Sequence, residues 1–319
     1  MMYRNSFNKI RSIEPDIVKY YEININDYEP ITLKAYKIVS DDGKEYFLKE
    51  TNAVALQKYQ YLYNQGVNNV IYPILNRNES FVTRANDSNY YISDYVKQIK
   101  IRNDTRVSNL YNELSILHQQ TQIRKSLDPS KSRGKFDELS SQLDYKFRLL
   151  EQLVRKIEAK NLDTFTLPIL ENYHYILDAK KELVKLQKRL ISSIKAHEGV
   201  NYSFVHNNPD LDHLLNIKGV NYLSSLDNGK IGINSLDMAK FYVMNEQYDI
   251  DFKQLILDKY YDENQLFYYD YFRFLVLVIY IKRMPITIDD YINANSFVDT
   301  SESIKRYFKN FLDYKEETS

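Results

Sequence analysis

The densest group of side chains with acid–base or metal-binding chemistry begins at His206. Asp210, Asp212, His213 and Asp227 follow within a short stretch of the chain. Carboxylates combined with an imidazole suit manganese or zinc better than magnesium, which strongly favours oxygen ligands. The four later residues therefore suggest a metal site, although aspartates in solvated loops are the more ordinary explanation. His206 suggests a general base, with a structural role in bracing the loop as the stronger alternative.

Residues 1–97 contain the pattern of a small β-sheet. Apolar residues on both sides of an Asp-Asp-Gly turn predict a β-hairpin over 32–49. Residues 51–65 predict a short helix, which ends at Gly66 because glycine readily adopts the left-handed conformation found after helices. Three further strands are predicted over 70–75, 80–84 and 90–96. We therefore expect an antiparallel sheet that carries one helix.

The remaining residues, 98–319, are predicted to be mainly helical, beginning with a helix over 107–120. Apolar residues spaced three and four apart predict a long helical hairpin over 136–198. A mixed stretch over 202–235 contains the histidines and aspartates described above, and a final helical block completes the chain. A sheet-rich part and a helix-rich part, divided after Lys97, predict an α+β chain with two lobes.

The composition excludes several classes of protein. The chain has 43 Lys plus Arg and 43 Asp plus Glu, so no overall charge attracts nucleic acid or an anionic membrane. It has no cysteine, which excludes disulfides, Cys-ligated zinc and thiol catalysis. The longest apolar run, over 274–281, is too short to span a bilayer, and the first residues lack the apolar stretch of a signal peptide. We therefore expect a soluble cytoplasmic protein.

Several segments resemble the aminoglycoside phosphotransferase and choline kinase group, which includes spore-coat-type kinases. The pattern of the group's catalytic segment is His-Gly-Asp-x-x-x-x-Asn, and this chain carries His206-Asn207-Asn208 and then His213. The group's metal-binding sequence, Ile-Asp-Phe-Asp, is matched by Ser224-Ser225-Leu226-Asp227, and its later Asp-Leu-Ala by Asp237-Met238-Ala239. The resemblance places the catalytic segment over 203–239.

Residues nearer the N-terminus carry the same resemblance in the same order. Tyr46-Phe47-Leu48-Lys49 is similar to the strand that bears a phosphate-contacting lysine, and 90–96, which includes Asp94, is similar to the hinge strand. The resemblance implies a protein kinase-like fold. Its small sheet-rich N-lobe would span 1–97, and its large helical C-lobe, into which the predicted hairpin is inserted, would span 98–319.

Three positions that the group uses for phosphoryl transfer are altered in this chain. Asn208 stands where the resemblance places the catalytic aspartate, and an amide is not basic enough to accept the proton of a hydroxyl. His213 replaces an asparagine that binds the metal, and Ser225 replaces a metal-binding aspartate. The loss of one electrostatic contributor commonly slows an enzyme by about 10²–10³. The resemblance therefore implies a catalytically inactive relative, a pseudokinase that serves as a binding or regulatory protein.

The nucleotide side of the predicted cleft is altered as well. Residues 51–65 contain no acidic residue that could pair with Lys49, and residues 23–32 contain no glycine for a phosphate-binding loop. Lys49, Asp94 and Asp227 are the remaining candidates for contact with a nucleotide. The resemblance assigns His206 and Asp237 to anchoring the catalytic loop. We therefore expect no bound metal and no cofactor.

Two other functions remain open at this stage. An active small-molecule phosphotransferase would need ATP and magnesium, with Asp210 or Asp212 as its base. An interaction protein would bind an unknown protein partner through the helical hairpin or the C-lobe. A basic loop over 124–135 and the hairpin lysines suggest nucleic-acid binding only weakly, because solvated helix faces often carry such charges.

Overall fold

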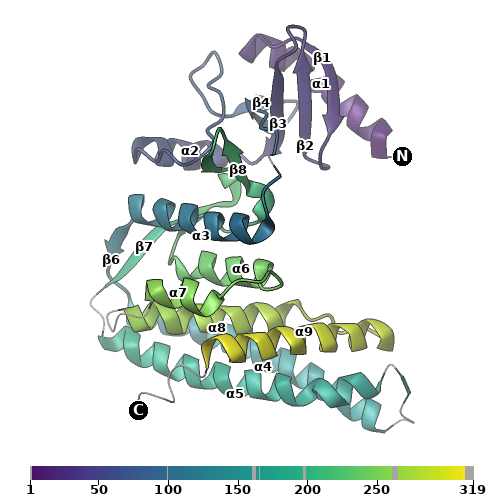
Figure 1. The fold of residues 1–319 in the computed structure, drawn as a ribbon, viewed down its shortest axis with the longest axis vertical. Coiled ribbons are helices and arrows are strands. Elements are labelled where there is room, and N and C mark those ends of the chain that lie inside the picture. Colours follow the sequence, from purple (N-terminus) through teal and green to yellow (C-terminus); the bar gives the residue numbers. More distant parts are fainter. Residues whose placement is uncertain are drawn as a thin grey trace. The chain divides into compact units, whose positions relative to one another are not determined.

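The computed structural model describes residues 2–98, 100–159, 163–164, 166–196, 199–260 and 265–312 (Figure 1). The chain divides into two units that are each built from two stretches of sequence. The first unit lies within 1–122 and 203–231, and the second within 123–202 and 232–319. The predicted α+β class is confirmed, with a small antiparallel sheet and a large helical part. The lobe boundary after Lys97 does not coincide with this division and stays a prediction.

A five-stranded antiparallel sheet forms the centre of the first unit, in the order β1-β2-β3-β5-β4. Its strands are β1 (Ile25–Pro30), β2 (Ala35–Ser40), β3 (Glu45–Thr51), β4 (Thr83–Ala85) and β5 (Ser88–Asp94). The predicted hairpin is β2 and β3, and its turn uses Gly43 at a φ of 79°. Residues 70–75, by contrast, form no strand, and only Val70 makes an isolated bridge, to Leu223. Pro73 lies in this run and cannot donate a ladder hydrogen bond.

Helix α1 (Met2–Tyr21) packs against one face of the sheet. Its Ile10, Ile13 and Ile17 are buried in a cluster with apolar side chains of β2, β3 and β5. The sequence prediction missed this helix, although the spacing of these three isoleucines by three and four residues is the pattern of a helix face. Because α1 covers one face, the opposite face of the sheet is left to form the candidate site.

Helix α2 (Ala55–Asn64) is the predicted short helix, followed by Gly66 at a φ of 69°. Tyr59 and Leu62 are buried, and the ring of Tyr59 packs on Tyr91 of β5 at a centroid distance of 5.7 Å. The first unit also contains α3 (Asn103–Gln120), the second half of β7 (Val200–Val205), and the strands β8 (Leu214–Ile217) and β9 (Val220–Leu223), with short 3₁₀ turns at 211–213 and 226–228. The strands β8 and β9 form a short antiparallel hairpin.

The second unit is helical and contains the predicted long hairpin. Its helices are α4 (Pro129–Glu158), α5 (Leu167–Ala196), α6 (Ser235–Asn245), α7 (Phe252–Tyr260), α8 (Leu266–Arg283) and α9 (Asp290–Phe311). Helix α5 packs against α4, α8 and α9, and these long helices lie beside one another (Figure 1). Residues 197 and 198 of the predicted hairpin lie outside the described residues. Partner binding through the hairpin stays a prediction.

The basic stretch over 124–135 is not a loop, as the sequence had suggested. Residues 124 and 125 are the last two residues of β6 (Ile123–Lys125), and residues 129–135 form the first turns of α4. The helix starts early because the Asp128 side chain accepts hydrogen bonds from the backbone N–H groups of Ser130 and Lys131. Among the described residues, no helix is both long and apolar enough to cross a membrane.

Candidate functional site: a cleft beside residues 208–227

A cavity of about 450 Å³ lies against the face of the sheet opposite α1, and all of its lining residues belong to the first unit. Successive side chains of a strand point to opposite faces. Tyr46 and Leu48 of β3 therefore join the α1 cluster, whereas Phe47 and Lys49 line the cavity. The remaining walls come from the β1–β2 connection, β5 and the segment from Asn208 to Ser225. Cavities that bind small molecules usually measure about 300–1,000 Å³.

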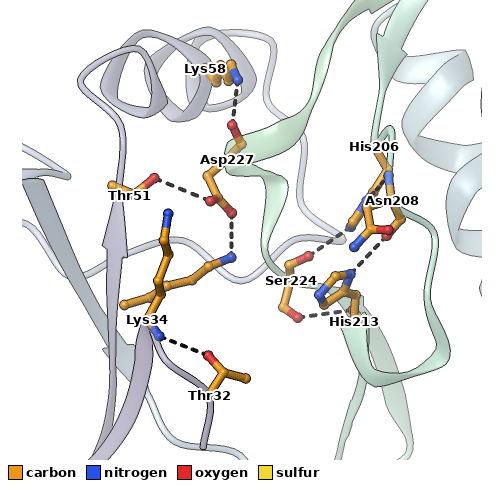
Figure 2. Close-up of polar contacts among 10 residues, drawn as sticks. Thr32, Lys34, Thr51, Lys58, His206, Asn208, His213, Ser224 and Asp227 are labelled. Carbon is orange, nitrogen blue, oxygen red and sulfur yellow. Dashed lines mark hydrogen bonds and ion pairs between the residues drawn. The ribbon is translucent and has the colours of Figure 1, made fainter. Parts of the chain in front are cut away.

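Lys49 forms an ion pair with Asp227 across the base of this region. The Lys49 Nζ atom lies 2.8 Å from Asp227 Oδ1, and the side chains are 17% and 7% exposed. The Thr51 hydroxyl donates to the other carboxylate oxygen at 3.3 Å. Lys58 of α2 donates to the backbone carbonyl of Asp227, as Figure 2 shows. The carboxylate partner of Lys49 is therefore Asp227, far along the chain, rather than a residue of the neighbouring helix α2.

Lys58 is the only charged residue between 51 and 65. It lies on α2, the helix on which the kinase pattern predicts an acidic partner for Lys49. Burial lowers the pKa of Lys58, and the nearby Asp227 carboxylate partly opposes that shift. Lys58 and Thr51 are thus two contacts of Asp227 that the kinase pattern does not predict. In the sequence, the feature that marks Lys58 is its position as the single charge on an otherwise uncharged predicted helix.

Ser225, which stands at a metal-binding position of the kinase pattern, has a left-handed backbone with φ 60° and ψ 42°. This conformation is uncommon outside glycine and is often found at functional sites. A hydrogen bond links Ser225 to Tyr91, whose pKa is raised by burial and by the nearby Tyr59 and Asp227. The position therefore offers a neutral hydroxyl that is engaged with a buried tyrosine.

His206 holds the segment together through its two ring nitrogens. The backbone N–H of Asn208 donates to Nδ1 at 3.3 Å, and Nε2 lies 2.9 Å from the carbonyl oxygen of Ser224. An Nδ1 that accepts places the proton on Nε2, which then donates to Ser224. These contacts support bracing of the loop over general-base chemistry. Asp237, the other expected anchor, is fully buried in α6 and belongs to the second unit, so its anchoring role stays a prediction.

His213 is a buried imidazole that also serves the loop. Its Nδ1 lies 2.9 Å from the carbonyl oxygen of Asn208, and its ring stacks on His206 at 5.3 Å. Burial lowers the pKa of His213, and Lys49 lowers it further, while the hydrogen bond to Asn208 and the carboxylates Asp210 and Asp227 oppose the shift. Both Asn208 and His213 line the cavity.

The depressed pKa of His213 predicts a loss of stability on acidification. An unfolded chain protonates histidine at about 6.5, so below that pH the unfolded state binds more protons than the folded state. Stability should therefore fall as the pH drops through about 6.5 toward the folded pKa. The His213→Asn variant, which keeps a donor for the Asn208 carbonyl, should lose less in thermal midpoint between pH 7 and pH 5. An equal loss in both proteins would contradict this prediction.

The four residues considered as a metal site do not assemble one. The described residues contain no group of three or more histidines, aspartates or glutamates placed to hold a metal ion. The Asp210 carboxylate accepts a hydrogen bond from the backbone N–H of Asp212 at 2.8 Å. The Asp212 side chain is 92% exposed and lies 3.9 Å from Arg106. The metal site suggested for Asp210, Asp212, His213 and Asp227 is therefore corrected to a set of loop and ion-pair contacts.

Asp94, the third residue assigned to the nucleotide cleft, lies at the end of β5 and lines the cavity. Its carboxylate is 65% exposed and pairs with Lys44 at 3.2 Å. The structure thus places Lys49 and Asp94 on the cavity wall and Asp227 behind Lys49. Their contact with a nucleotide stays a prediction.

No family model matches the sequence, and no curated protein sequence matches it significantly. Solved structures match over nearly the whole chain. An aminoglycoside phosphotransferase from Alicyclobacillus acidocaldarius has a TM-score of 0.64 at 13% identity, covering 95% of this chain and 96% of its own. A choline kinase from Streptococcus pneumoniae has a TM-score of 0.52 at 13% identity, with 93% and 99% covered.

The chain has the kinase-like fold of the aminoglycoside phosphotransferases and choline kinase. A spectinomycin phosphotransferase, solved with ADP and spectinomycin, shares it at a TM-score of 0.52 and 14% identity, with 94% of this chain and 98% of that chain covered. The resemblance predicted from the sequence is thus confirmed for the fold. At identities of 13–14%, this likeness establishes the fold and nothing about activity.

Proposed function

We propose that this protein is a catalytically inactive member of the kinase-like fold that uses its cleft to bind a ligand or to regulate a partner. One observation carries the proposal. Lys49 is paired with Asp227, while the positions expected to supply a base and metal ligands hold Asn208, His213 and Ser225.

The chemistry of these groups explains why transfer should fail. Phosphoryl transfer depends mainly on positioning and on electrostatic stabilisation, with metal ions neutralising the phosphate charge. The Asn208 amide cannot act as a base, and the Ser225 hydroxyl carries no charge. The Nδ1 atom of His213 is engaged with the Asn208 carbonyl. The described residues also provide no cluster for a metal ion.

The cavity supports a binding role in place of catalysis. It remains open at about 450 Å³. Aromatic side chains of Phe47 and Tyr91, whose ring centroids are 6.4 Å apart, lie in its wall together with the hydroxyl-bearing Ser93 and Ser224. This combination of flat apolar surface and a few polar groups is typical of small-molecule sites.

Thermal stabilisation by nucleotide and metal separates this proposal from an active kinase. A ligand at 100 times its Kd stabilises a protein by about 2.7 kcal/mol. We expect ATP with Mg²⁺ or Mn²⁺ to give no rise in thermal midpoint beyond that given by ATP in EDTA. A rise that requires the metal and is lost in Lys49→Met would contradict the proposal.

One observation favours the alternative of an active phosphotransferase. The open cavity is lined by Lys49 and by both aspartates, Asp210 and Asp212, that could act as a base. Under this alternative, Asp210→Asn or Asp212→Asn would abolish transfer from magnesium ATP to a hydroxyl. If the protein is inactive, the wild type shows only background transfer from ATP, and neither Asp210→Asn nor Asp212→Asn lowers it.

A further inference from the structure

We infer that Asp227 fills, from within the chain, the anion site formed by Lys49 and Thr51, and so makes the metal-free cleft reject phosphate-bearing ligands. This inference rests on the proposed function, because it concerns the selectivity of the same cleft. It assigns to Asp227 the role of a specificity-determining residue.

The surroundings of the Asp227 carboxylate are those of a bound anion. One oxygen accepts from the Lys49 ammonium at 2.8 Å, and the other accepts from the Thr51 hydroxyl at 3.3 Å. Lys58 holds the same residue through its backbone carbonyl (Figure 2). Charge-assisted hydrogen bonds of this kind are the ones that capture carboxylate and phosphate groups. An incoming phosphate would therefore have to displace Asp227 or share its donors.

The position of Asp227 is fixed by its neighbours. The carboxylate side chain is only 7% exposed, and the 3₁₀ turn that carries it packs against α2. The Asn207 side chain donates to the carbonyl of Asn228, one residue further along, at 3.1 Å. Because these contacts hold the turn, a shift of Asp227 away from Lys49 would have to break some of them.

The charges around the cavity oppose anions as well. Among the described residues of its wall, Lys49 is the one lysine or arginine, and the aspartates Asp94, Asp210 and Asp212 also line it. Two of these aspartates have basic partners outside the wall, Lys44 for Asp94 and Arg106 for Asp212. Asp227 already neutralises Lys49. The Asp227 carboxylate is only 7% exposed, so its repulsion of an incoming phosphate is stronger than it would be in water, and the described residues offer no metal cluster that would offset it. A ligand without phosphate groups avoids this repulsion.

Calorimetric titration with pyrophosphate in EDTA tests the inference on the full chain. We expect no detectable binding of pyrophosphate to the wild type. Asp227→Asn and Asp227→Ser should bind it with an affinity at least about tenfold above the detection limit, since each substitution frees the Lys49 charge. Adding Lys49→Met to either variant should remove the gain. Higher salt should weaken the gained binding, because screening reduces charge attraction.

Two outcomes would overturn the inference. One is binding of pyrophosphate by the wild type in EDTA, a result that does not depend on whether any variant folds. The other is a folded Asp227→Asn or Asp227→Ser protein, shown by its circular dichroism, that gains no affinity. A wild type that binds ATP only with Mg²⁺ would instead contradict the proposed function while leaving the metal-free exclusion of phosphate intact.

Discussion

Replacing Gly229 with alanine should lower the thermal midpoint by about 4–5 °C, equivalent to roughly 3 kcal/mol of stability. Gly229 has φ −62° and ψ 161°, a backbone conformation open to any residue, so the glycine is required only for space. A Cβ atom there would lie 2.3 Å from two ring carbons of Phe204. Phe204 is 2% exposed and stacks on Tyr61 at 6.1 Å, which leaves its ring little room to move.

A matched glycine distinguishes this clash from a general effect of alanine. Gly134 lies within α4, and a Cβ atom built there meets nothing within 4 Å. Gly134→Ala should therefore stabilise the protein, by about 1 kcal/mol. Phe204→Leu combined with Gly229→Ala should cost less than the two changes added separately, because the smaller side chain makes room. Thermal unfolding followed by circular dichroism compares the three single variants and the double variant with the wild type. An unchanged midpoint in Gly229→Ala would refute the predicted clash.

Asp227→Ala should destabilise the protein by about 2–3 kcal/mol. Removing one partner of a fully buried ion pair costs about 3–5 kcal/mol, because the remaining charge is left unpaired. The cost should be smaller here because Lys49 remains 17% exposed and borders an open cavity. The change also removes the acceptor of the Thr51 hydroxyl. Urea unfolding, with the wild type in parallel, measures the difference.

Asp94→Ala is the control for that measurement. Asp94 also pairs with a lysine, Lys44, but the two side chains are 65% and 54% exposed. Substitutions at such exposed positions usually change stability by no more than about 0.5 kcal/mol. Similar losses in Asp227→Ala and Asp94→Ala would show that the Lys49–Asp227 pair is not a structural anchor of the catalytic segment.

Local pattern was sufficient for much of the fold. The β2–β3 hairpin follows from its Asp-Asp-Gly turn, and α2 from its run ending at Gly66, because turns and helix ends depend on a few adjacent residues. Helix α1 was missed even though Ile10, Ile13 and Ile17 carry its periodicity. The apolar run over 70–75 reads as a strand, yet whether such a run joins a sheet depends on partners far away in the sequence.

In the candidate site too, the local sequence identifies individual residues but not the contacts between residues that are far apart in the chain. Lys49 and Asp227 were each singled out from the sequence, but their contact joins positions 178 residues apart. The kinase pattern predicts the partner of Lys49 on the adjacent helix, but the only charged residue between 51 and 65 is Lys58. The aspartates near His213 suggested a shared metal site, but spacing in a loop does not determine the direction of side chains. In the structure Asp210 turns onto its own loop, and Asp212 faces solvent.

Transfer of the γ-phosphate of ATP is the most direct test of the account. Repurified protein is incubated at high concentration with radiolabelled ATP, with Mg²⁺ or Mn²⁺, and with hydroxyl-bearing acceptors such as choline and aminoglycosides. We predict that label transfer and ATP loss equal those of Lys49→Met and Asp227→Ala prepared identically. Metal-dependent transfer that persists through repurification and disappears in both variants would contradict the account.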